Sequence, residues 1–154
     1  MKKTLILISC ISAITACSVQ KTSKTGENKI GDTRTTKVVS LDDDTYKLSE
    51  QSDDQTYGYD QKNPIKVGGK DGSGPKNERR FLNALTGPGG EPVKYYRRGS
   101  CCSFKTPNGF IDNMGLLDRY AVYWEGGQDT MTLYLNMYDN GDLKIPVNFK
   151  AKSQ

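Results

Sequence analysis

The sequence predicts an α+β domain, in which one short helix packs on an antiparallel sheet of about four strands after a disordered N-terminal segment. Three observations lead to this fold class. A single stretch has helical periodicity, the stretches after it alternate apolar and polar residues, and short turn signals separate those stretches. Such short connections favour hairpins over the long crossovers of a parallel sheet.

The N-terminus has the features of an export signal. Lys2 and Lys3 precede an apolar run over residues 4–14, which is too short to span a bilayer. The run continues into Ala16 and Cys17, and residues 14–17 resemble the lipobox of bacterial lipoproteins. This resemblance implies that residues 1–16 are removed as a signal peptide and that Cys17 carries diacylglycerol and a further acyl chain such as palmitate.

Several acyl chains on Cys17 would anchor the protein stably in a membrane. Ser18 stands where an aspartate would favour the inner membrane, so we expect the outer membrane, and the lack of an acidic run after Cys17 favours its periplasmic face. The alternative is an ordinary secretory signal cut after Ala16, which leaves Cys17 as a free thiol.

Residues 17–56 are expected to form a flexible tether. They are rich in Lys, Thr, Ser, Asp and Gln, a composition that buries too little apolar surface to offset the entropy of ordering. The folded domain is therefore expected over residues 57–150, a length sufficient for one small domain.

The predicted helix covers residues 75–86. Phe81, Leu82 and Leu85 give it one apolar face, Pro75 suits its first turn, and the glycine-rich residues 87–90 end it. The glycine-rich loop before it, residues 68–75, lacks the residue order of a phosphate-binding loop, and we interpret it as a structural connection.

Four strands are predicted after the helix. They cover residues 93–98, 120–125, 131–138 and 143–149. Asn108-Gly109 favours a type I′ turn, and Pro146 places the last strand at an edge because proline cannot donate to a ladder.

Composition excludes several classes of function. The chain has 22 Lys and Arg, 18 Asp and Glu, and no His. This balance argues against a nucleic-acid partner, and the lack of His removes the usual nucleophilic triads and His-ligated metals. We expect no cofactor and no metal site.

The adjacent cysteines Cys101 and Cys102 are the most unusual feature of the folded part. Three states remain open: a strained disulfide between neighbours, two thiols packed structurally, or a redox or metal role. In a regular strand, Cys102 would share the inward face with Phe104 and Cys101 would be exposed.

Six further residues are candidates for contact with an anion or a glycan. The cationic ones pair along the chain and the aromatic ones fall on the polar face of a predicted strand; they are Arg79, Arg80, Arg97, Arg98, Tyr134 and Tyr138. The alternative is that the arginines solvate the surface and the tyrosines form cross-strand pairs.

Residues 63–69, 74–85, 99–109 and 133–138 resemble a group of small uncharacterised bacterial lipoproteins. Some members carry the name 2-dehydro-3-deoxyphosphooctonate aldolase, which implies condensation of phosphoenolpyruvate with arabinose 5-phosphate. That enzyme is a (β/α)₈ barrel of about 250 residues, so the length of this chain and its export signal argue against the activity.

We therefore expect a membrane-anchored envelope lipoprotein with a non-enzymatic binding or scaffold domain, whose partner is an envelope glycan or protein. No pair of catalytic carboxylates is evident in the sequence. The alternative is an enzyme, with either the aldolase activity or a thiol redox role of Cys101 and Cys102.

Overall fold

The computed structural model describes residues 37–68 and 72–153. The predicted signal peptide, Cys17 and residues 18–36 of the predicted tether lie outside this part of the chain, as do residues 69–71 of the glycine-rich loop. Within it, no helix is long and apolar enough to cross a membrane.

The described residues form one helix and eight strands. In chain order they are β1 (Ser40–Asp42), β2 (Thr45–Tyr46), β3 (Ile65–Lys66), α1 (Gly74–Asn83), β4 (Leu85–Thr86), β5 (Val93–Lys105), β6 (Met114–Trp124), β7 (Met131–Asn136) and β8 (Lys150–Ala151). The predicted α+β class is confirmed.

The helix forms as its apolar spacing predicts. Phe81 and Leu82 on α1 have no exposed surface, and Pro75 stands in the first turn, where a missing N–H costs nothing. The helix ends at Asn83, earlier than predicted, because Leu85 and Thr86 leave it to pair as β4 with β8.

The main sheet has the strand order β3-β7-β6-β5. The β5–β6 and β6–β7 pairs are antiparallel hairpins, as predicted, whereas β3 pairs in parallel with β7, so the sheet is mixed. Sequence reasoning missed this pair because β3 has only two residues. The alternation in β7 is confirmed, since Leu133 and Leu135 are fully buried in the core.

The strand predicted over residues 143–149 does not form. Ile145 makes only an isolated parallel bridge to Gln51, and Ser52 donates its backbone N–H to the Ile145 carbonyl at 2.9 Å. Pro146 has no N–H to extend a ladder. The segment still packs, because Ile145 and Phe149 belong to the core.

The predicted boundary between tether and domain at residue 56 is wrong. Tyr46 and Leu48 are 6% and 8% exposed and belong to the hydrophobic core. The β1–β2 hairpin contacts α1 through polar bonds, since Asn83 donates to the Asp44 carbonyl at 2.8 Å. The segment is therefore docked on the domain by two buried apolar side chains together with these polar bonds.

The predicted type I′ turn also lies elsewhere. The hairpin between β5 and β6 turns at Asp112 and Asn113, whose φ angles are 50° and 55°, and Met114 donates its N–H to the Ile111 carbonyl at 2.8 Å. Two consecutive residues with positive φ define this turn type. Asn108 is used differently, as an amide donor to the buried Asp139 carboxylate.

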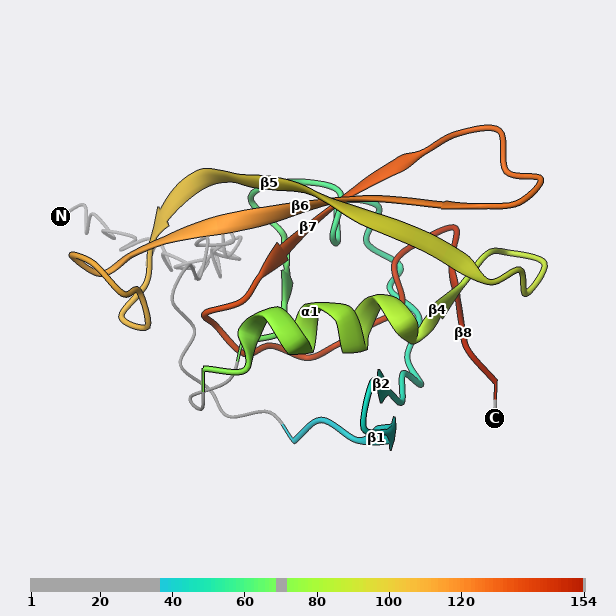
Figure 1. Cartoon of the computed structure of the whole chain (residues 1–154), viewed down its shortest axis with the longest axis horizontal. Coiled ribbons are helices and arrows are strands. Elements are labelled where there is room, and N and C mark those ends of the chain that lie inside the picture. Colours follow the sequence, from blue (N-terminus) through green and yellow to red (C-terminus); the bar gives the residue numbers. More distant parts are fainter. Residues whose placement is uncertain (1–36, 69–71, 154) are drawn as a thin grey trace, which may run out of the picture.

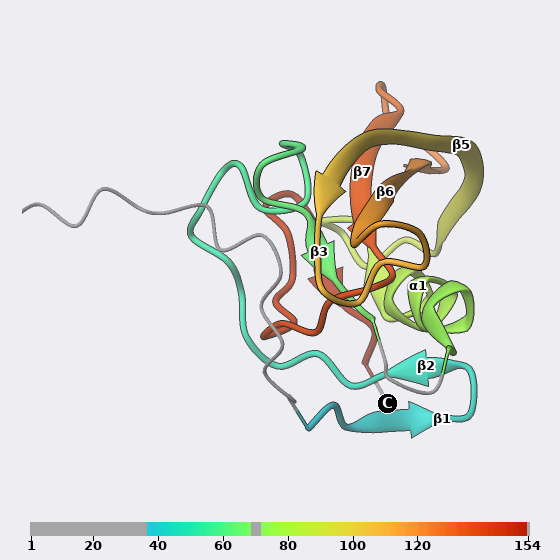
Figure 2. The same cartoon turned by 90° about the vertical axis from the view of Figure 1, so that its left-hand side faces the viewer.

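The elements are arranged in layers. The main sheet covers one side of α1, and the β1–β2 hairpin lies on the other side of the helix (Figures 1 and 2). The β5–β6 hairpin turn and the β4–β8 pair lie at opposite ends of the long axis (Figure 1). The sheet therefore has an inner face toward α1 and an outer face away from it.

Candidate functional site

The cysteine pair occupies a β-bulge in β5. The sulfur atoms of Cys101 and Cys102 are 2.12 Å apart, at disulfide distance, and both residues are half-buried. Cys102 has a φ of 55° and is the extra residue between the register pairs Cys101–Leu117 and Ser103–Leu116. A bulge of this kind bends an edge strand and interrupts its pairing surface.

The bulge changes which side chains share a face. Cys101 lies opposite Leu117 and Phe104 lies opposite Gly115, so Cys101 and Phe104 are on the same face of the sheet. The expectation that Cys102 shares the inward face with Phe104, made for a regular strand, is therefore wrong. Its reason is the extra residue, which shifts the alternation by one position.

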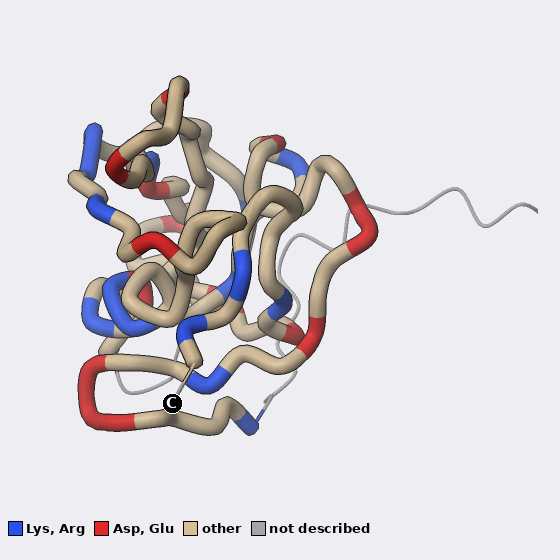
Figure 3. The backbone as a smooth tube through the Cα atoms, turned by 90° about the vertical axis from the view of Figure 1, so that its right-hand side faces the viewer, with Lys and Arg blue, Asp and Glu red and all other residues tan. Residues whose placement is uncertain are grey.

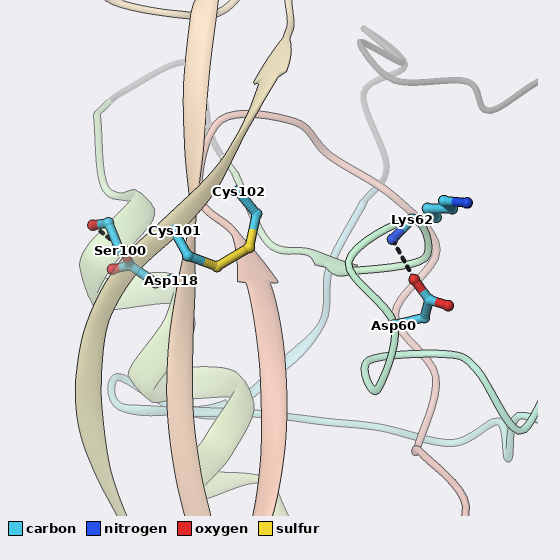
Figure 4. Close-up of a disulfide and its surroundings, with 6 residues drawn as sticks. All are labelled: Asp60, Lys62, Ser100, Cys101, Cys102 and Asp118. Atoms are coloured by element: carbon cyan, nitrogen blue, oxygen red, sulfur yellow. Dashed lines mark hydrogen bonds between the residues drawn. A yellow bond between two sulfur atoms is a disulfide. The ribbon is translucent and has the colours of Figure 1, made fainter.

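A buried polar cluster lies on the inner face between α1 and the sheet. Glu78 of α1 is fully buried, Asp118 of β6 is 3% exposed, and the Tyr120 hydroxyl donates to Glu78 at 2.9 Å. Arg97 donates twice to Asp118, at 2.5 Å and 2.8 Å, and the Ser100 hydroxyl donates to Asp118 at 2.8 Å. Ser100 and Asp118 are drawn in Figure 4.

The two carboxyl groups have opposite pKa shifts. Burial, and then the charge of Asp118, raises the pKa of Glu78 to about 8. Burial acts in the same direction on Asp118, but the hydrogen bonds from Arg97 and Ser100 outweigh it and lower the Asp118 pKa. Burial and the neighbouring Glu78 also raise the pKa of Tyr120. Glu78 is therefore protonated at neutral pH and Asp118 is ionised.

This carboxyl pair was missed by sequence reasoning, although a signal existed. Glu78 precedes Phe81 and Leu82 by three and four residues, which places it on the apolar face of the helix. Asp118 is in phase with Tyr120 and Val122 on the buried face of β6. Because both carboxyl groups are buried, the cluster connects the helix to the sheet and has no open surface for a substrate.

The four candidate arginines are not brought together into one site, although Arg79 and Arg80 of α1 line the same cavity. Arg80 is used locally, because it donates to the Asp43 carbonyl at 2.7 Å and to Asn77 at 3.1 Å, and its guanidinium lies 6.0 Å from the Tyr46 ring centroid. Arg79 is exposed on the same helix and lines a cavity of about 290 Å³. Figure 3 shows acidic segments close to the basic stretch of α1.

The side chains of Arg97 and Arg98 lie on different faces of the sheet. Arg97 binds Asp118 on the inner face. Arg98 is the extra residue of a second bulge in β5, and its guanidinium lies 5.9 Å from the ring centroid of Tyr96, which is 52% exposed. Tyr138 is likewise used in packing, with its ring 5.9 Å from Phe104.

Tyr134 lies at a second hollow, apart from the one on the helix. It is on the outer face of β7, and its backbone N–H donates to the Gly58 carbonyl at 2.7 Å, which holds the loop over residues 59–62 beside the strand. A cavity of about 390 Å³ is lined by Tyr134 and by the four loop residues, Tyr59, Asp60, Gln61 and Lys62. Figure 4 shows the loop, with Asp60 and Lys62, and the neighbouring disulfide.

Arg119 adds a cation to the same face. It pairs in register with Tyr134 on one side and with Gly99 on the other, so its side chain is beside an aromatic ring and next to a residue without a side chain. Its Nε atom is buried and has no hydrogen-bond partner within residues 37–68 and 72–153. Sequence analysis did not single out Arg119, because a lone arginine in a strand gives no distinctive pattern.

The outer-face site therefore comprises Tyr134, Arg119 and the loop residues Asp60 and Lys62. The Asp60 carboxylate accepts the backbone N–H of Lys62 at 2.8 Å, which fixes the loop. Neither Lys62 nor Arg119 forms a salt bridge with a carboxylate in the described part of the chain. The described residues contain no group of three His, Cys, Asp or Glu residues placed to hold a metal ion.

Comparison with known proteins gives no identification. No protein-family model, curated protein or solved structure matches this chain.

Proposed function

We propose that this protein is a lipid-anchored envelope protein that binds a glycan carrying carboxylate groups at the outer-face site. The lipobox-like residues 14–17 support the membrane anchor through Cys17. Ser18 after Cys17 favours the outer membrane, and the lack of an acidic run after Cys17 favours its periplasmic side. The cell-wall glycan would be within reach of a domain held there.

The observation that carries this proposal is a buried guanidinium Nε without a partner, in Arg119, which pairs in register with Tyr134 at the hollow. Buried polar groups are normally hydrogen-bonded, so the unpartnered Nε of Arg119 calls for an explanation. A ligand carboxylate would supply the missing acceptor, and guanidinium groups bind carboxylates in a bidentate manner. The cavity of about 390 Å³ is within the usual size range of ligand sites.

Each residue of the site has a distinct role in this proposal. Tyr134 is half-buried and offers its ring to the apolar face of a sugar, as tyrosines do at binding surfaces. Asp60 accepts hydrogen bonds from sugar hydroxyl groups. Arg119 and Lys62 bind the carboxylate, Arg119 by its planar fork and Lys62 as a point charge.

The test uses cell-wall sacculi, whose glycan carries carboxylates, and chitin, which has a similar sugar backbone without them. Mature chain with Cys17→Ser, which removes the lipid, is sedimented with each polymer at low salt. We expect binding to sacculi and much weaker binding to chitin. Arg119→Gln and Tyr134→Ala should each weaken binding about tenfold or more. Tyr134→Phe keeps the ring and should bind like the parent chain.

Lys47→Gln is the matched control for loss of one positive charge, because Lys47 is exposed and remote from the outer-face site. Equal binding to chitin and sacculi, or an Arg119→Gln chain that binds as well as Lys47→Gln, would overturn the proposal. If Arg79→Gln alone abolished binding, the anion site would be on the helix.

The anchor is tested separately. Cells fed an alkyne analogue of palmitate should label the parent chain, and Cys17→Ser should lose the label and leave the membrane fraction. Labelling that survives Cys17→Ser would contradict lipidation at this residue.

A further inference from the structure

The outer face of the main sheet carries a second set of aromatic rings. Tyr96 of β5 and Tyr123 of β6 are in an edge-to-face contact with ring centroids 6.4 Å apart, and they are 52% and 36% exposed. We call these two residues the aromatic pair. Tyr123, Ala121 and Arg119 alternate along β6 and share one face, and Tyr96 is opposite Ala121. The aromatic pair is therefore on the same face as Arg119.

The aromatic pair is in line with the outer-face site. Arg119 and Tyr123 are four residues apart on β6, which places them about 13 Å apart along the strand. Ala121 lies between them and has no exposed surface, and its partner on β7 is Thr132. Along β6 and β7, only these two small side chains separate the aromatic pair from Arg119 and its neighbour Tyr134.

The charged side chains near the aromatic pair are cationic. Lys94 is the register partner of Tyr123, and the Arg98 guanidinium lies 5.9 Å from the Tyr96 ring centroid. Both cations are exposed, and neither forms a salt bridge in the described part of the chain. Asp118 is the single acidic residue of β5, β6 and β7, and it is buried on the inner face. An anionic ligand can therefore lie along the outer face of these strands without repulsion from a carboxylate of the sheet.

We propose that the outer-face site continues to the aromatic pair, so that the protein binds a stretch of a carboxylate-bearing glycan chain across several sugar units. One unit occupies the hollow beside Tyr134, with its carboxylate on Arg119. A unit further along the chain stacks on the aromatic pair, and Lys94 and Arg98 bind its carboxylate. This inference rests on the proposed function and extends it from recognition of one unit to recognition of a polymer.

Two contacts with one glycan chain strengthen each other. Once the first unit is bound, the second contact forms without a further loss of translational freedom, so a long ligand should bind much more tightly than a short one. Both contacts are built on strands of one sheet, which fixes the spacing between them. A short fragment reaches only one of the two contacts.

The test compares two lengths of the same glycan. Cell-wall strands freed of their stem peptides carry a lactyl carboxylate on every disaccharide, and they are separated into single disaccharides and fragments of several disaccharides. Calorimetry at low salt measures binding of each to the mature Cys17→Ser chain. We expect the long fragment to bind at least tenfold more tightly than the single disaccharide. Equal affinities would overturn the extended site.

Variants of the aromatic pair locate the second contact. Tyr96→Ala and Tyr123→Ala should each weaken binding of the long fragment about fivefold or more and leave the single disaccharide unaffected. Tyr96→Phe keeps the ring and should match the parent chain, whereas Tyr134→Ala should weaken binding of both ligands. If the two alanine variants bind the long fragment as the parent chain does, the inference fails, while the effect of Tyr134→Ala still supports the proposed function.

Phe110→Ala is the matched control at an exposed aromatic residue. Phe110 is 78% exposed and lies in the turn beyond the other end of β5, so its loss should change binding of neither ligand. A long fragment that depended on Phe110 and not on Tyr96 would run toward the turn, which would refute the assignment to the aromatic pair. Circular dichroism and urea unfolding of each variant separate loss of binding from loss of folding.

The charges have their own control. Arg98→Gln should weaken binding of the long fragment several-fold at low salt, whereas Lys47→Gln should not, because Lys47 is exposed and remote from this face. Poly-glutamate carries carboxylates without sugar rings. If it competed as well as the long fragment, the face would bind polyanions in general and the glycan inference would be wrong. If neither glycan ligand bound the parent chain, the proposed function would fail and this inference with it.

Discussion

The carboxyl groups of Glu78 and Asp118 interact where α1 packs on β6, and a proton on Glu78 removes the repulsion between two negative charges. Oε1 of Glu78 is buried and has no partner among the described donors, while Tyr120 donates to its other oxygen. Two neighbouring buried carboxylates would repel each other. A proton on Glu78, donated toward Asp118, completes a chain of hydrogen bonds from Tyr120 to Arg97.

Stability should depend on pH through Glu78. Its folded pKa of about 8 lies above its ordinary value of 4.5, so the folded chain holds a proton that the unfolded chain releases. The free energy of unfolding should therefore fall as pH rises from about 5 to 8, by up to about 1.4 kcal/mol per pH unit. Urea unfolding at several pH values measures this slope.

Glu78→Gln is the control for this slope. Its amide keeps a donor for Asp118 and an acceptor for Tyr120 without an ionisable proton, so stability should become nearly flat between pH 5 and 8. At pH 8 this variant should exceed the parent chain. Below about pH 4 both chains should lose stability, because the Asp118 carboxyl has a lowered pKa in the folded chain and the unfolded chain therefore binds the proton first. An unchanged slope in Glu78→Gln would refute the assignment.

Arg97→Ala should destabilise the domain by about 2 kcal/mol, since it leaves a buried Asp118 carboxylate without its charged donor. The adjacent Arg98→Ala loses the same charge but no ion pair, and it should change the free energy of unfolding by less than about 0.5 kcal/mol. Urea unfolding at pH 7 compares them. Equal effects of the two substitutions would show that the Arg97–Asp118 pair contributes nothing.

The bulge at Cys102 can be tested apart from the disulfide. Cys102 has a φ of 55°, a conformation that costs a residue with a side chain about 1 kcal/mol relative to glycine. With Cys101→Ser in both chains, Cys102→Gly should be more stable than Cys102→Ser by about that amount. Thermal unfolding of the two chains measures this difference. A glycine variant that is less stable than the serine variant would argue against the bulge.

The disulfide itself has a chemical test. The mature domain isolated without reductant should be about two daltons lighter than its dithiol form and should bind iodoacetamide at Cys101 and Cys102 only after reduction. Alkylation of both residues before reduction would mean that the thiols are free in the folded protein.

Strong local patterns in this chain predict structure, and weak ones do not. The helix around Phe81 and Leu82 and the alternation of Leu133 with Leu135 could be predicted, because each pattern fills one buried face. The pairing of β3 with β7 could not, since two residues carry no periodicity. Tyr46 and Leu48 were assigned to the tether because isolated apolar residues give no pattern at all.

The candidate site was harder to predict for a related reason. The bulges at Arg98 and Cys102 shift the faces of β5, and a bulge depends on partner strands that are distant in sequence. Arg119 and Tyr134 become neighbours only through the β6–β7 register. Asn108-Gly109 has the composition of a hairpin turn, yet Asn108 is used by Asp139 and the chain turns later.

Asp139 should be the polar residue whose loss most disturbs the turn between β5 and β6. It is fully buried, and its carboxylate accepts hydrogen bonds from Thr106, Asn108 and Asn136. Asp139→Ala should cost about 3 kcal/mol, because the buried Thr106 and Asn136 and the half-buried Asn108 lose their acceptor. Asp139→Asn should cost nearly as much, since its amide nitrogen would face a donor.

The control is Asp142→Asn, which removes the same charge from an exposed position three residues away and should change stability by less than about 0.5 kcal/mol. Hydrogen exchange locates the effect. In both Asp139 variants the amides of Gly109 and Met114 should exchange faster, because Thr106 and Asn108 are then no longer tied to the end of β7. If exchange at Met114 were unchanged while the core exchanged faster, Asp139 would stabilise the domain as a whole and not the turn between β5 and β6.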